Sequence, residues 1–126
     1  MPLIVRAFPV LAGKEEAAIA FADEVGTRQD TAAFFQRHGI RRESWHLQRT
    51  PSGAVIIVIT DVEGPPLERA AGYQNSQASY ELWFKDRVRE LSGIDPDTQP
   101  LGPPTQTIFS YDSENRRKSF DSPVPG

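Results

Sequence analysis

The chain contains no cysteine, and this absence removes several kinds of chemistry at once. Without thiols there can be no disulfide, no thiolate nucleophile and no cysteine-based metal site. A basic excess is also missing: the formal net charge is −3 at pH 7, so no general positive field attracts nucleic acid or an anionic membrane surface. We therefore expect no nucleic-acid partner and a reducing, cytoplasmic location.

Long apolar runs are missing as well. No stretch approaches the roughly 20 apolar residues of a membrane-spanning helix, and residues 1–6 do not begin a signal peptide. The chain has no glycine-rich phosphate loop, no nucleophile elbow and no dinucleotide fingerprint. We therefore expect no membrane partner, and kinase, serine hydrolase and dehydrogenase activities have no support.

Two short segments, residues 3–8 and 54–59, are the most apolar of the sequence. Their length and their β-branched residues predict strands that are buried on both faces. Residues 42–50 and 105–111 alternate instead, which is typical of half-buried strands. The four residues 50–53 have proline second and glycine fourth, as a type I turn prefers, and predict a hairpin between 42–50 and 54–59.

Helical spacing of apolar residues covers two longer stretches. The first begins near paired glutamates at 15–16, which suit the positive end of a helix dipole, and its apolar face continues to about residue 37. Gly26 and Thr27 weaken its middle, but 37–39 has the features of a single C-terminus, so we predict one helix. We also predict a short helical turn at 67–71, a polar connector at 73–78 and a second main helix at 79–91.

This order of elements predicts an α+β fold, a ferredoxin-like βαββαβ sandwich over residues 1–111. Its four-stranded antiparallel sheet would hold 3–8 and 54–59 in the centre, with both main helices on one face. A polar tail, 112–126, would follow. The other sheet face would expose half of two apolar strands, so we predict a homodimer that packs these faces together.

The chain at this point resembles the dimeric α/β-barrel superfamily. The residues RAFP at 6–9 with GKEEA at 13–17 are similar to its strand-to-helix entry, and ELWF at 81–84 is similar to the aromatic helix of its uncharacterised members. The superfamily includes antibiotic-biosynthesis-monooxygenase-like proteins, stress-responsive A/B-barrel proteins and polyketide cyclases. The resemblance covers residues 1–111 and implies a homodimer and a monooxygenase or cyclase that uses no cofactor. Haem is not expected, because the superfamily's haem-degrading branch needs a histidine that 79–91 lacks.

His46 is the sharpest catalytic candidate, because histidine is the one side chain here that accepts a proton near pH 7 without a special environment. It is predicted to lie mid-strand, on the face opposite Trp45. The same residue is explained without catalysis as an edge-strand histidine hydrogen-bonded at a dimer surface. His38 suits the negative end of a helix. The two histidines lack metal-ligand spacing, so no metal is expected.

Trp83, Tyr73 and Arg49 are the predicted substrate-binding residues, because aromatic rings suit flat organic molecules and arginine suits an acid group. Arg6 is a second such arginine, and either arginine can pair with Glu43 instead. Two functions stay open. One is a cofactor-independent monooxygenase or cyclase acting on a small aromatic or polyketide-like molecule, and the other is a non-catalytic dimeric ligand-binding or accessory domain. An enzyme pocket of about 300 Å³ or more would favour the first.

Overall fold

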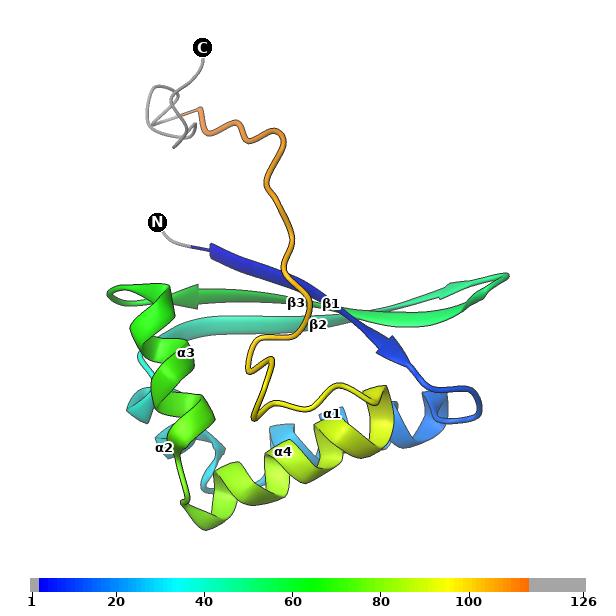
Figure 1. The fold of residues 1–126 in the computed structure, drawn as a ribbon, viewed down its shortest axis with the longest axis horizontal. Helices are drawn as coiled ribbons and strands as arrows, with labels where there is room; N and C mark the ends of the chain where they lie inside the picture. Colours follow the sequence, from blue (N-terminus) through cyan, green and yellow to red (C-terminus); the bar gives the residue numbers. More distant parts are fainter. Residues whose placement is uncertain (1–2, 114–126) are drawn as a thin grey trace.

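In a computed structural model, the chain is described from residue 3 to residue 113 and forms three strands and four helices (Figure 1). In chain order they are β1 (Leu3–Val10), α1 (Glu15–Thr27), α2 (Thr31–Arg37), β2 (Ile40–Thr50), β3 (Gly53–Val62), α3 (Pro66–Asn75) and α4 (Ser79–Ser92). The helices all lie on one side of the sheet (Figure 1). An α+β fold with its helices on one sheet face is thereby confirmed.

The sheet has the strand order β1-β3-β2, and both pairings are antiparallel. Because β3 is central, its backbone groups form ladders with neighbours on both sides. The predicted hairpin is confirmed, since Thr50 pairs with Gly53 across the turn. The register places Arg6 of β1, Val58 of β3 and Trp45 of β2 in one row, so their side chains share the face that the helices cover.

The predicted fourth strand is absent from the part of the chain that the structure describes, where 105–111 form no strand. The Thr105 hydroxyl donates to the Val5 carbonyl at the sheet edge, and the chain then runs away from the sheet (Figure 1). Pro103 and Pro104, just before this segment, have no N–H with which to begin a ladder. The prediction of four strands with β1 in the centre is therefore wrong here, and β1 is an edge strand. The predicted tail lies outside the described residues beyond Ser113.

The predicted single first helix is also wrong, because α1 ends at Thr27 and α2 begins at Thr31. Polar side chains satisfy the break locally. The Arg28 guanidinium donates two hydrogen bonds to the Asp30 carboxylate, and the Thr31 hydroxyl donates to the Val25 carbonyl at 2.7 Å. The Thr31 hydroxyl thereby satisfies one carbonyl that the end of α1 leaves unpaired, and the Arg28–Asp30 pair joins two side chains within the break.

The helix α3 is longer than the helical turn predicted at 67–71. It begins at Pro66, where the missing N–H of proline is harmless, and continues to Asn75. Tyr73 therefore lies on a helix, whereas the sequence pattern predicted a connector there. The prediction for 79–91 is confirmed by α4, which ends at a left-handed Gly93.

The core lies between the sheet and the helices and is rich in aromatic rings. The Phe84 ring of α4 contacts Phe21 and Phe34 at centroid distances of 5.2 Å each. Tyr80 is buried in the same cluster, and its hydroxyl shares a 2.7 Å hydrogen bond with Thr31. These ring contacts pack both α1 and α2 against α4.

A buried ionic cluster fastens α2 to α4 at one end of the core. The Glu81 side chain is fully buried and accepts hydrogen bonds from Arg37 Nη2 and His38 Nε2, both at 2.7 Å. Burial alone would raise the pKa of Glu81, but the hydrogen bonds from Arg37 and His38 outweigh it and lower the pKa to about 2. Glu81 is therefore ionised at neutral pH.

Within residues 3–113, no helix is both long enough and apolar enough to cross a membrane.

Candidate functional site

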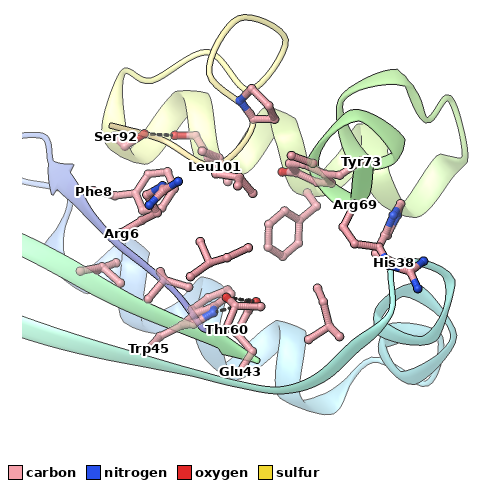
Figure 2. A pocket seen from close by; sticks show the side chains of 18 of the residues that line it. Arg6, Phe8, His38, Glu43, Trp45, Thr60, Arg69, Tyr73, Ser92 and Leu101 are labelled. Atoms are coloured by element: carbon pink, nitrogen blue, oxygen red, sulfur yellow. Dashed lines mark hydrogen bonds between the residues drawn. The ribbon is translucent and has the colours of Figure 1, made fainter. Parts of the chain in front are cut away.

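A cavity of about 140 Å³ lies between the inner face of the sheet, the helices and the loop that follows α4. Figure 2 shows Arg6 and Phe8 at one side of this hollow, Tyr73 and His38 at the other, and Glu43, Trp45 and Thr60 at its floor. Leu101 covers it from the loop. The volume is smaller than expected for an enzyme pocket and matches one aromatic ring, because a cavity of roughly 150 Å³ holds benzene. Most of the lining side chains are apolar.

The loop can cover the cavity because Gly102 lies against Phe8. Gly102 has φ +78°, and a Cβ at this position would lie 2.7 Å from the Phe8 ring. Only glycine adopts this conformation without strain and allows so close an approach. The cover of the cavity therefore depends on one residue without a side chain.

Glu43 is the only acidic side chain among the described residues that line the cavity. Each of its two oxygens accepts one hydrogen bond, Oε2 from Trp45 Nε1 at 2.7 Å and Oε1 from the Thr60 hydroxyl at 2.9 Å. Burial raises the pKa of the Glu43 carboxyl, although these two hydrogen bonds act in the opposite direction. A carboxyl with a raised pKa is a stronger base than an exposed carboxylate and is suited to take and return a proton.

Tyr73 lines the cavity from α3, and Arg6, the second arginine that the sequence suggested for an acid group, lines it from β1. Burial, and next the charge of Glu43, raise the pKa of the Tyr73 hydroxyl well above the ordinary value, so Tyr73 stays protonated. A neutral phenol in this position can donate a hydrogen bond to a bound molecule.

Three predicted site residues, His46, Arg49 and Trp83, lie outside the cavity. His46 is exposed on the opposite sheet face, where Nε2 lies 2.9 Å from the Ser44 hydroxyl. Arg49 forms an exposed ion pair with Glu16 at 3.7 Å. The structure thus separates His46 from Tyr73 by the thickness of the sheet, and the role of His46 as proton acceptor stays a prediction.

Trp83 packs beside the core, where its ring lies 5.5 Å from Phe21 and under the Arg28 guanidinium at 4.2 Å. It contributes to the aromatic cluster without reaching the cavity wall.

Glu43 was missed by the sequence analysis, although a signal was present. The alternation of 42–50 places Glu43 on the same face as Trp45, which was expected to be buried. A charged residue on a buried strand face needs a partner or a function.

Within residues 3–113, no group of three or more histidine or acidic side chains is arranged to hold a metal ion.

Comparisons with known proteins bear on the fold alone. No family model matches the chain, and no curated protein matches its sequence. Among solved structures, it is similar to an L-rhamnose mutarotase from Formosa agariphila, with a TM-score of 0.59 and 11% sequence identity, over 89% of this chain and 100% of that one. This likeness shows that the chain has a ferredoxin-like α/β fold.

Proposed function

We propose that the cavity binds a small, single-ring organic molecule and that Glu43 moves a proton on it. The observation that carries this proposal is a carboxyl held by Trp45 and Thr60 at the floor of an apolar cavity. Two fixed hydrogen bonds aim the group, and burial makes it a stronger base than an exposed carboxylate.

Proton removal from a carbon beside a carbonyl is the step we assign to Glu43. The same step begins the two reactions considered for this chain, because a cyclase and a cofactor-independent monooxygenase both need a carbanion. The mutarotase named above shares the fold, but a sugar ring presents several hydroxyl groups. The cavity offers few polar partners for them, so an aromatic or polyketide-like ring fits its lining better.

The test is exchange of carbon-bound hydrogen for deuterium. The full chain is incubated in D₂O with phenylacetone, whose benzylic protons are acidic and whose ring matches the cavity, and loss of the benzylic signal is followed by proton NMR. We expect exchange well above that of an equal concentration of a folded control protein. Binding without exchange would favour the alternative, a non-catalytic ligand-binding domain. The absence of both binding and exchange would contradict the proposal.

We also propose that the protein forms a homodimer through the uncovered sheet face. The side chains of Val5, Ile57 and Ile59 lie on that face, away from the helices, and Leu3 at its edge is 58% exposed. A second copy related by a two-fold axis would cover both apolar faces at once. In that arrangement His46, which shares a row with Ile57, lies at or near the contact.

Replacing Ile57 by lysine is expected to convert this dimer to a monomer. An unpaired charge buried at the contact costs several kcal/mol, which weakens association by about a hundredfold or more. The measurement is mass by light scattering at micromolar concentration. Ser52→Lys, which adds the same charge at the hairpin turn, is the control that keeps the dimer. A wild-type protein that scatters only as the 14.0 kDa monomer contradicts the assembly.

A further inference from the structure

Arg6 differs from the other arginines in how its charge is compensated. Within residues 3–113, every arginine except Arg6 and Arg69 forms an ion pair with a carboxylate. The Arg69 guanidinium donates to the Glu63 carbonyl at 2.8 Å. Arg6 donates from Nη1 to the Val5 carbonyl at 3.0 Å. Its positive charge therefore has no acidic partner in the described part of the chain.

One donor of Arg6 is also left without an acceptor. Its Nε is buried and has no hydrogen-bond partner, while the side chain lines the cavity. Arg87 has an unpaired Nε too, but its guanidinium lies 2.9 Å from Glu90, so its charge is compensated. An unpaired donor beside an unpaired charge is unfavourable in the free protein, and an anionic ligand would remove both penalties.

Glu43 cannot supply the missing partner because the sheet keeps the two apart. Arg6 lies on β1 and Glu43 on β2, with β3 between them, and their rows differ: Arg6 is level with Val58, and Glu43 with Thr60. Two strand spacings of about 4.8 Å each separate the backbones. Arg6 thus borders the cavity from one side and Glu43 from its floor, so one molecule in the cavity can lie against both.

We propose that Arg6 binds the carboxylate of a single-ring ligand whose reacting carbon lies toward Glu43. This inference rests on the proposed function, because it assigns an orientation to a molecule in that cavity. The guanidinium would offer Nε–H and a neighbouring N–H side by side, the fork that a carboxylate accepts. Burial lowers the pKa of Arg6, which is the direction expected for a cation that lacks a partner in a mostly apolar site.

The test compares two probes of one shape, 4-fluorobenzoate and 4-fluorobenzamide, which differ in charge. Binding to the full chain is followed by fluorine NMR. We expect the wild-type protein to bind the benzoate about ten- to a hundredfold more tightly than the benzamide. Arg6→Gln should remove this preference and leave benzamide binding within about twofold, and Arg6→Lys should keep part of it because a point charge replaces the fork.

Arg87→Gln is the matched control, since it removes an arginine that also has an unpaired Nε but lies outside the cavity lining. Equal binding of both probes, unchanged by Arg6→Gln, overturns the inference and leaves the cavity as a binding site. Loss of the preference in Arg69→Gln and not in Arg6→Gln overturns it too, by placing the anion at the other end. If neither probe binds, the proposed function itself is contradicted. Should Arg6→Gln not fold, Arg6→Lys and the wild-type preference decide.

Discussion

Replacing Glu81 by glutamine is expected to lower the free energy of unfolding by about 3 kcal/mol at pH 7. The glutamine keeps the size of the side chain but removes the charge that Arg37 and His38 share. Glu81 is fully buried, so water cannot replace the lost interactions there. The measurement is urea denaturation at a fixed protein concentration, followed by the fluorescence of Trp45 and Trp83.

The stability that the Glu81 carboxylate contributes is expected to depend on pH. The pKa of Glu81 is about 2 in the folded protein, below its ordinary value of 4.5. An acid with a lowered pKa contributes stability that is fully present above the ordinary pKa and is lost as the pH falls toward the folded value. The difference in stability between the wild-type protein and Glu81→Gln should therefore be constant from pH 7 to about pH 5 and shrink between 4.5 and 2.

Glu90→Gln is the matched control on the same helix. Glu90 also contacts two cations, Arg87 at 2.9 Å and Lys14 at 3.9 Å, but its side chain is 45% exposed. Exposed pairs contribute about 0–1 kcal/mol, so this variant should lose little stability. Equal losses in the two variants would show that burial does not distinguish Glu81.

Replacing Glu43 by glutamine is expected to slow the deuterium exchange described above by about 10²–10⁴-fold. Glutamine keeps the shape of the side chain, and its amide oxygen can still accept a hydrogen bond from Trp45. It cannot take a proton from carbon at neutral pH. Glu63→Gln, which removes an exposed acid outside the cavity, should leave the exchange rate unchanged.

The same variant should be more stable than the wild-type protein at alkaline pH, which is opposite to Glu81→Gln. An acid whose pKa is raised in the folded protein ionises less readily than in the unfolded chain, and it costs no stability below the ordinary pKa of 4.5. The cost grows as the pH rises from 4.5 to the folded pKa and is complete above it. The exchange rate of the wild-type protein should rise over that same range, as the base ionises. Unchanged exchange in Glu43→Gln would exclude Glu43 as the proton acceptor.

These two glutamates show why a site is harder to predict than a strand. The alternation over 42–50 determines that Glu43 and Trp45 share a face, but their hydrogen bond to each other and that of Glu43 to Thr60 depend on side-chain packing. Glu81 belongs to a helix whose bounds were predicted well. Its partners Arg37 and His38 are more than forty residues away in sequence, and nothing local indicates them.

Local patterns in the sequence predict the elements whose signal lies within one segment. Period-two alternation, the Pro51–Gly53 turn and the two apolar segments were sufficient for the β2–β3 hairpin, for the pairing of β1 with β3 and for the side of the sheet on which each residue lies. Features that depend on competing contacts between segments are not encoded in such local patterns. Short-range hydrogen bonds at 28–31 broke the first helix, and 105–111 left the sheet edge after two prolines. Packing of the helices covered the face of Trp45 and left that of His46 uncovered. It also brought Glu43, Arg6 and Tyr73 around one cavity, because distances between segments are set by the whole core and not by any pattern within one segment.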